Sequence, residues 1–315
     1  MNLYLMLAPM AEISHRPLRE LIEIFGGCNE YFTEMISANA YCAGGPFEAW
    51  YDDALPRPEK TVYQLVGADT EKLVQAASLL DQKDCKGIDI NMGCSAPLIA
   101  KTGAGISWMK SIDEAGLMIS RVRHSVKRRL SVKLRIGFND DFEYLCRFCK
   151  RLEEEGVELI TLHPRTAKEK FKRRARWEYV AALKRELKIP VAGNGDINSI
   201  EDISKRCQDC DALMIGRLAI RQPWIFSQAQ NIDNSSLPLS TKPSETFLEE
   251  TGLHFLELLA KYQPPEFHLS RARRFFSYFC DNLTWGNHVK NLLNREKDLV
   301  GIEKTWKNYF NNERL

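Results

Sequence analysis

The 315-residue chain has no hydrophobic run approaching the roughly 18 consecutive apolar residues that a membrane-spanning helix needs. Its opening residues form a short apolar stretch without the basic flank and longer apolar core of a secretory signal peptide. Neither sign of charge dominates, because the net charge is only +2. The overall charge therefore gives no preference for a polyanionic partner. These absences predict a cytoplasmic protein that does not enter a membrane.

A Gly-x-Gly-x-x-Gly loop is missing after the first expected strand, which argues against an open, doubly wound nucleotide-binding sheet. Cysteine, in contrast, is not scarce, because the chain has nine. The two Cys-x-x-Cys pairs, Cys146/Cys149 and Cys207/Cys210, fall in different helical stretches that a barrel would hold apart. We therefore predict buried free thiols rather than a metal site or a disulfide framework.

Strand-like segments recur along the chain, with helical segments between most of them. Eight strands are expected to begin near Leu3, Glu30, Thr61, Gly87, Ser131, Leu159, Pro190 and Ala212. Helices are expected at 16–25, 70–81, 111–128, 143–154, 177–187 and 199–205. Strands that alternate with helices pair in parallel, and eight such units close into a barrel. The sequence thus predicts an α/β fold, a (β/α)8 TIM barrel, over residues 1–235.

The pattern changes after the last expected strand. Residues 231–243 are rich in Asn, Ser and Pro, which is typical of a linker. Residues 244–315 are predicted to be wholly helical, and a segment of that size has little room for a large core of its own. We predict a C-terminal all-helical domain that packs against the barrel and helps to shape a cleft.

Polar residues follow several of the expected strands, at the end of a barrel where enzymes of this fold carry their chemistry. Cys94 ends the run Asn91-Met92-Gly93-Cys94, which directly follows the apolar, strand-like run Gly87-Ile88-Asp89-Ile90. Lys133 and Arg135 lie on one face of the next strand, where a charge is costly unless it points into the barrel mouth and meets a partner. His163 and Arg165 end the strand after that. Their coincidence predicts a catalytic site.

The last two strands end in Gly193-Asn194-Gly195-Asp196 and Gly216-Arg217, where barrels commonly hold a phosphate. Glycines let backbone N–H groups approach an anion, and Arg217 adds a charged fork. A buried Lys133 opposite this phosphate site suits flavin mononucleotide (FMN), because a cation stabilises negative charge on the reduced ring. Ala8-Pro9-Met10 would offer backbone groups and an apolar wall to the ring.

These residues resemble the tRNA-dihydrouridine synthase family, over the barrel and more weakly through the helical tail. The ordered motifs that carry the resemblance are Ala8-Pro9-Met10, Thr33-Glu34-Met35, Gln64-Leu65, Asn91-Met92-Gly93-Cys94, Val132-Lys133-Leu134-Arg135-Ile136-Gly137, His163-Pro164-Arg165-Thr166, Gly193-Asn194-Gly195-Asp196 and Ile215-Gly216-Arg217. The arrangement looks most like the bacterial subfamily that acts on uridine 16 of the D-loop, with uridine 20 as the alternative. One departure is Ser95, where the family usually has Pro after the cysteine; Pro97 follows two residues later.

The resemblance implies an oxidoreductase in which NADPH reduces FMN, hydride passes to C6 of a uridine, and Cys94 protonates C5. The FMN contacts implied are Ala8, Pro9, Met10, Gln64, Lys133 and His163, with Asn194, Gly195, Asp196, Gly216 and Arg217 at the ribityl phosphate. Asn91 and Arg165 would lie near the uracil, and Glu34 would help to orient the tRNA. An unperturbed thiol suits the acid role, because it is mostly protonated at neutral pH.

Two clusters of cations are candidates for binding tRNA. The segment 168–176 carries six cations against one anion, and it follows the sixth strand, so it should lie at the same mouth as Cys94. Its candidate contacts are Lys172, Arg173, Arg174 and Arg176, and those of the second cluster are Arg271, Arg273 and Arg274. Helical spacing predicts that Arg271 and Arg274 share one exposed face. Two basic surfaces beside one cleft suit a folded RNA bound through its phosphates, by a monomer of this chain.

Two rival functions stay open at this point. An FMN-dependent barrel reductase of free pyrimidines would use comparable residues, but would need neither the cationic segment 168–176 nor the helical tail. An RNA-binding protein on a barrel that has lost its chemistry would have lost its flavin contacts as well. The sequence retains Lys133, His163, Asn194 and Arg217, which favours the enzyme.

Overall fold

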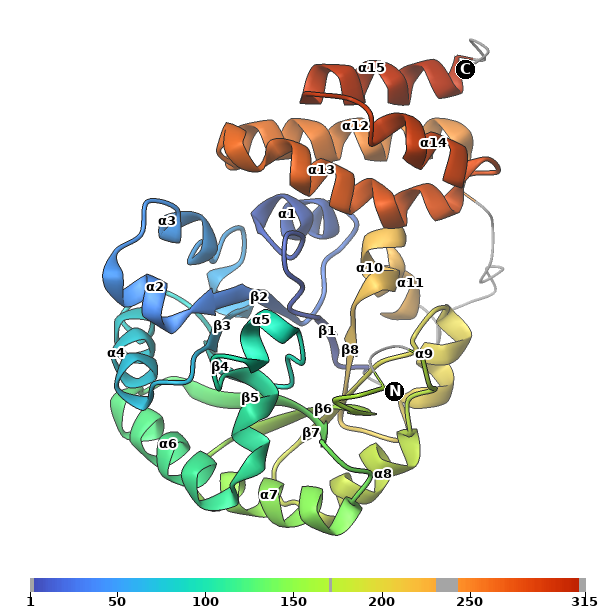
Figure 1. The fold of residues 1–315 in the computed structure, drawn as a ribbon. Coiled ribbons are helices and arrows are strands. Elements are labelled where there is room, and N and C mark those ends of the chain that lie inside the picture. Colours follow the sequence, from blue (N-terminus) through green and yellow to red (C-terminus); the bar gives the residue numbers. More distant parts are fainter. Residues whose placement is uncertain (1–2, 170–171, 231–242, 312–315) are drawn as a thin grey trace.

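The computed structural model describes residues 3–169, 172–230 and 243–311. Within them, eight parallel strands form a closed barrel in which each strand pairs with the next and the last pairs with the first (Figure 1). The strands are β1 (Leu5–Leu7), β2 (Glu30–Ser37), β3 (Thr61–Val66), β4 (Gly87–Met92), β5 (Arg129–Gly137), β6 (Leu159–Thr166), β7 (Val191–Asn194) and β8 (Ala212–Ile215). The predicted (β/α)8 TIM barrel is confirmed.

Helices cover the outside of the barrel (Figure 1). The six that the sequence predicts are α1 (Arg16–Ile24), α4 (Thr70–Asp81), α6 (Ile112–Ser125), α7 (Phe142–Glu154), α8 (Trp177–Glu186) and α9 (Ile200–Arg206). Shorter turns are α2 (Ala38–Ala43), α3 (Glu48–Tyr51), η1 (Pro58–Lys60), α5 (Pro97–Ala100), η2 (Gly105–Lys110), α10 (Arg217–Arg221) and α11 (Ile225–Gln230). Ser111 caps α6 by accepting the N–H of Glu114. That helix ends earlier than predicted, because Val126 is already extended and leads into β5.

Alternate residues of the strands point into the barrel, as the two-residue period of a strand requires. In its middle they form a small apolar layer: Met6, Ala8, Phe32, Val62, Leu159, Ala192, Ala212 and Met214. The outward residues pack against the helices in a larger core. Polar side chains occupy both ends of the barrel interior. A lower set lies at the amino-terminal end of the strands, and an upper set lies toward their carboxyl ends.

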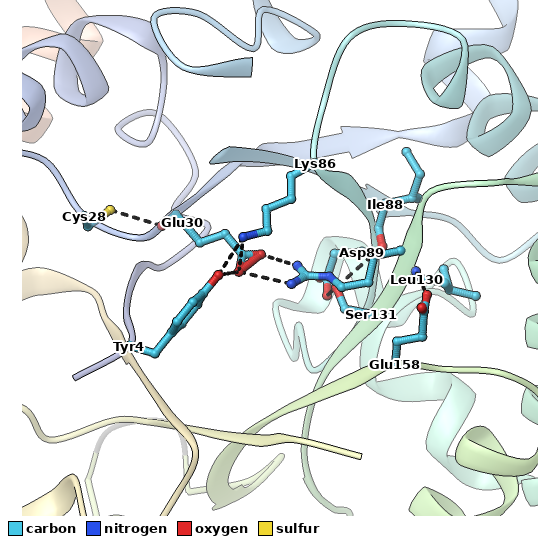
Figure 2. A network of polar contacts seen from close by, with 10 residues as sticks. Tyr4, Cys28, Glu30, Lys86, Ile88, Asp89, Leu130, Ser131 and Glu158 are labelled. Atoms are coloured by element: carbon cyan, nitrogen blue, oxygen red, sulfur yellow. Dashed lines mark hydrogen bonds and ion pairs between the residues drawn. The ribbon is translucent and has the colours of Figure 1, made fainter. Parts of the chain in front are cut away.

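The lower set closes the amino-terminal end of the barrel around Glu30, which has no exposed surface (Figure 2). Its carboxylate accepts hydrogen bonds from both terminal nitrogens of Arg129 and from the Tyr4 hydroxyl at 3.0 Å. Lys86 Nζ lies 3.7 Å from the same carboxylate. These partners compensate the negative charge of the buried carboxylate. Removing either the carboxylate or its cationic partners would leave an uncompensated charge.

We expect Glu30→Gln to destabilise the fold by about 3 kcal/mol, the low end of the range for breaking a buried ion pair, because Arg129 keeps 21% exposure. Urea unfolding at pH 7 measures this change. Glu71→Gln is a matched control, since it breaks an exposed pair with Arg121 and should cost less than about 1 kcal/mol. Equal losses in the two variants would contradict the role assigned to Glu30.

The C-terminal segment is wholly helical where it is described, with α12 (Glu245–Tyr262), α13 (Pro265–Phe279), η4 (Cys280–Asn282), α14 (Gly286–Leu293) and α15 (Leu299–Phe310). Its centre is aromatic: the rings of Phe255 and Phe275 stack at 3.8 Å, and Phe276 packs on Trp306 at 4.7 Å. α12 lies on α1 and α13 lies on α10 (Figure 1). One hydrophobic core runs from the barrel into these helices, which confirms that the helical segment packs against the barrel.

The predicted linker 231–243 falls almost wholly on residues 231–242, which lie outside the described residues, so the domain boundaries stay a prediction. The nine cysteines are free thiols, and Cys146, Cys149 and Cys210 are buried as predicted, whereas Cys207 is partly exposed. In the described part of the chain, no helix is both long enough and apolar enough to cross a bilayer.

Candidate active site

The upper polar set gathers at the carboxyl ends of β3 to β6. It contains Gln64, Asn91, Lys133 and His163, which come from four neighbouring strands, and Asp89 lies below Asn91 in the middle of β4. The strand register places Gln64 beside Asp89 and Asn91 beside Lys133. Because alternate residues of a strand point to the same side, and these positions point inward, the side chains meet inside the barrel. The structure therefore brings together Gln64, Asn91, Lys133 and His163, which the sequence predicts at this mouth.

Cys94 lies two residues beyond β4 and is partly exposed. Its N–H donates to Asn91 Oδ1 at 2.9 Å, and its carbonyl accepts the Ile106 N–H at 3.0 Å. Gly105 packs so closely here that a Cβ would lie 2.6 Å from the Cys94 carbonyl oxygen, and its φ of +60° also favours glycine. The cysteine backbone is thus held from two sides, while the side chain lies close enough to Lys133 and Arg135 to influence their pKa values.

The departure at Ser95 has a simple local consequence. Pro97 occupies the first turn of α5, where a missing N–H costs nothing. Ala96 before it is extended, as the residue that precedes a proline prefers. The proline therefore starts the short helix after the cysteine instead of following it directly.

Lys133 is a partly buried ammonium inside the barrel. Burial and, to a smaller extent, the nearby Arg135 lower its pKa to about 8, against the opposing influence of Asp89. It has no hydrogen-bonding or ion-pair partner among the residues that the structure describes. A cation in this position can meet a negatively charged group of a bound molecule.

His163 and Arg165 form a hydrogen-bonded pair on β6. Arg165 Nη1 lies 2.9 Å from His163 Nε2, and arginine only donates, so this nitrogen accepts and the proton sits on Nδ1. Burial lowers the pKa of His163 well below its usual range, and the surrounding cations lower it further. His163 is therefore a neutral imidazole at physiological pH.

Arg165 is also held by Asp196, which follows β7. Its Nη2 lies 2.5 and 2.6 Å from the two carboxylate oxygens, and the Ala175 N–H donates to the same carboxylate at 2.7 Å. Burial opposes ionisation of Asp196, but these hydrogen bonds outweigh it and lower the pKa of the carboxyl. The oxygens of Asp196 thus accept from Arg165 and from the Ala175 N–H.

The ends of β7 and β8 form the opposite side of the mouth. Gly195 has a φ of +114°, and a Cβ there would lie 2.8 Å from the His163 ring. Asn194 Nδ2 donates to the Met214 carbonyl at 2.7 Å, and nothing crowds Gly216 closer than Met10 Sδ at 3.5 Å. Arg217 is exposed and close enough to lower the pKa of His163. Glycine backbone and one arginine therefore lie together here.

The backbone groups of Ala8 and Met10, in the segment after β1, are hydrogen-bonded within the protein. The Met10 N–H donates to Ser14 Oγ at 2.9 Å, and its carbonyl accepts from the N–H groups of Ile13 and Ser14. The Ala8 N–H donates to the Ile215 carbonyl. Local turns and strand pairing thus satisfy these groups, and the partly buried Met10 side chain packs against the apolar layer inside the barrel.

Three of the four cations predicted on the segment after β6 are exposed. Lys172, Arg173 and Arg174 face solvent, and the Arg173 side chain is 76% exposed. Arg176 is different, because its guanidinium binds Glu169 at 2.5 Å and Asp140 at 3.2 Å. Hydrogen bonds from Arg176 and, to a smaller extent, from Thr166 lower the pKa of Glu169 to about 2. Through these ion pairs Arg176 is held at Glu169 and Asp140, next to the exposed cations.

The prediction that Arg271 shares an exposed basic face with Arg274 is wrong. Arg271 is 2% exposed and binds Glu34, itself buried, at 2.9 Å. Its guanidinium also lies 4.4 Å from the centre of the Phe267 ring. The buried carboxylate on β2 needs a cation, and α13 supplies it. Arg273 is half-buried and donates to the Glu296 carbonyl, which leaves Arg274 as the exposed member.

Sequence reasoning passed over Asp89, which has no exposed surface. It stands in the apolar run Gly87-Ile88-Asp89-Ile90, two residues before Asn91 and hence on the same inward face. A charged residue in a strand buried on both faces was the signal that could have found it.

A family model described as "Dihydrouridine synthase (Dus)" matches residues 6–313. The chain is 34% identical over 230 residues to a "Probable tRNA-dihydrouridine synthase" of Aquifex aeolicus, covering 70% of this chain and 71% of that one. It is 30% identical over 250 residues to "tRNA-dihydrouridine synthase B" of Pasteurella multocida, covering 76% and 73%. Among solved structures, a histamine dehydrogenase from Rhizobium sp. 4-9 matches with a TM-score of 0.54 and 11% identity, over 81% of this chain and 49% of that one. This last likeness concerns the fold alone.

Proposed function

The chain belongs to the dihydrouridine synthase family, and from this premise we propose that it reduces the C5–C6 double bond of a D-loop uridine in tRNA, with FMN as cofactor and NADPH as reductant. Family membership makes it an oxidoreductase that acts on tRNA. The observation that carries the finer proposal is the position of Cys94, partly exposed at the barrel mouth beside Asn91 and Lys133. We place the enzyme in the cytoplasm, acting as a monomer.

The residues at the mouth fit FMN. Lys133 is an ammonium without a described protein partner, which suits the anionic edge of a flavin. Gly195, Gly216 and Arg217 suit a phosphate, because two glycines bring backbone close and the arginine adds charge. When bound, FMN supplies hydride-transfer chemistry, with NADPH as the source of electrons. Asp196 contributes by holding Arg165, and His163, being neutral, does not compete with Lys133 for negative charge.

The chain itself supplies the proton. Saturation of the C5–C6 bond needs a hydride at C6 and a proton at C5, and the Cys94 thiol donates that proton. Asn91 holds the Cys94 N–H, which keeps the cysteine in place while a base enters the mouth. The target uridine must leave its stack to reach Cys94, and a loop base is the least costly to extrude.

Incubation of the purified protein with NADPH and unmodified tRNA tests this proposal. We expect a yellow protein, NADPH consumption that depends on tRNA, and dihydrouridine at position 16, with position 20 as the alternative. Consumption of NADPH with free uracil but not with tRNA would favour the free-pyrimidine reductase. A colourless protein that binds tRNA would favour the RNA-binding alternative.

Neutralising the exposed cations of the segment after β6 should weaken tRNA binding. For the Lys172→Ala/Arg173→Ala/Arg174→Ala variant, we expect the slope of log K against log salt to fall by about 2, because three phosphate contacts are lost. Titration of tRNA at several salt concentrations measures the slope.

A matched triple variant replaces exposed cations at the opposite rim, Arg121, Lys127 and Lys188, which precede β5 and β7. It should keep the wild-type slope. An equal fall in both triples would mean that total charge, rather than the barrel mouth, governs binding.

A further inference from the structure

Asp89 begins a chain of hydrogen bonds that leads to Cys94. Its Oδ1 accepts from Ser131 Oγ at 2.7 Å, and its Oδ2 accepts from Gln64 Nε2 at 2.7 Å. Asp89, Gln64 and Ser131 have no exposed surface. Figure 2 shows Asp89 beside Ser131 on the neighbouring strand.

The chain continues toward the mouth through two amides. Gln64 Oε1 accepts from Asn91 Nδ2 at 2.9 Å. Asn91 Oδ1 then accepts the N–H groups of Gly93 at 3.1 Å and Cys94 at 2.9 Å. One continuous set of contacts therefore joins a buried carboxylate to the backbone of the proposed proton donor.

The orientations of the Gln64 and Asn91 amides in this chain of hydrogen bonds are determined at both of its ends. A peptide N–H only donates, so the oxygen of Asn91 must face Cys94, and its nitrogen must face Gln64. An ionised carboxylate only accepts, so the nitrogen of Gln64 must face Asp89, and its oxygen must face Asn91. Burial raises the pKa of Asp89 to about 6, against the hydrogen bonds from Ser131 and Gln64, so the carboxylate is ionised above neutral pH. Both ends demand the same orientation of each amide, and flipping either amide breaks contacts on both of its sides.

We propose that Asp89 is a positioning residue for the reaction, which orients Gln64 and Asn91 so that Asn91 holds the Cys94 backbone at the barrel mouth. The inference rests on the proposed function in one respect, the role of Cys94 as proton donor. A buried carboxylate that only served as a counter-charge for Lys133 would need no particular orientation of Gln64.

Exchanging the acid and the amide tests the orientation. In Asn91→Asp alone, two carboxylates flank Gln64, whose single NH2 group can serve only one of them. Adding Asp89→Asn restores the contacts of this chain: the new amide donates to Gln64 Oε1, Gln64 Nε2 donates to the new carboxylate, and that carboxylate still accepts from Gly93 and Cys94. Only the contact of Asn91 Nδ2 with Met35 Sδ, at 3.2 Å, is not replaced. Adding Asp89→Leu removes the same charge but supplies no donor to Gln64, which makes it the matched control.

The first measurement is hydrogen exchange at the Gly93 and Cys94 amides, in protein without flavin. We expect exchange about tenfold faster in Asn91→Asp, and in its combination with Asp89→Leu, because the acceptor of both amides is displaced. In the Asp89→Asn/Asn91→Asp variant, exchange should return to within about threefold of wild type.

The second measurement is steady-state tRNA reduction. We expect kcat to fall about 10²-fold in Asn91→Asp with KM for tRNA nearly unchanged, and the exchanged pair to recover at least about tenfold of that loss. Rescue by leucine equal to that by asparagine, or no rescue by asparagine, would overturn the positioning role. If the wild-type protein failed to reduce tRNA, the proposed function would fall, but the amide exchange pattern would still decide the role of Asp89.

Discussion

Cys94→Ala should lower the rate of tRNA reduction by about 10²–10⁴-fold, the usual contribution of a positioned general acid, while FMN binding and reduction by NADPH persist. The contacts that hold the residue use its backbone N–H and carbonyl, which bond to Asn91 and Ile106, so alanine keeps the loop in place. Only the thiol is lost. Mixing reduced enzyme with unmodified tRNA and following flavin reoxidation in a single turnover measures this step alone.

Cys207→Ala is the matched control, because Cys207 is also partly exposed but follows α9, away from the barrel mouth. It should reoxidise at the wild-type rate. A near-normal rate in Cys94→Ala would show that the proton comes from another group. Loss of FMN from that variant would instead mean that the thiol has a structural part in the flavin site.

Lys133→Met should weaken FMN binding by at least about 10²-fold, since methionine keeps the apolar stem and removes the charge that we propose faces the flavin. Quenching of FMN fluorescence at pH 7 measures the dissociation constant. Lys110→Met is the control, because Lys110 is exposed and lies over the Phe138 ring rather than in the barrel. Equal affinities of the Lys133 variant and wild type would exclude Lys133 from the flavin site.

The same lysine predicts a pH dependence of FMN binding. Its pKa lies below the ordinary lysine value, at about 8, so the charged form is present at pH 7 and is lost as pH rises through 8. If FMN binds only the charged form, the dissociation constant should rise about tenfold between pH 7 and pH 9. The Lys133→Met variant should lack this rise.

The helical segment shows where sequence reasoning reached its limit. Arg271 and Arg274 are three residues apart, and that spacing correctly places them on neighbouring positions of α13. Which of them faces solvent depends on Glu34, 237 residues away, whose buried carboxylate draws Arg271 inward. No local pattern on α13 records that partner. The same holds for Arg176, whose charge is compensated by Glu169 and Asp140 rather than left free for RNA.

The sequence by itself determined the barrel, because strand and helix periods are local properties, and eight alternating units leave few ways to close a sheet. It also indicated which polar residues lie at the barrel mouth, because those residues stand at the carboxyl ends of strands, at positions that point inward. Only the tertiary structure decided which of them hold one another: Asp89 with Gln64 and Asn91, Arg165 with Asp196, and Glu34 with Arg271. The reason is physical. A hydrogen bond needs its two atoms within about 3 Å and correctly oriented, and that distance joins residues from different strands whose spacing along the chain carries no such information.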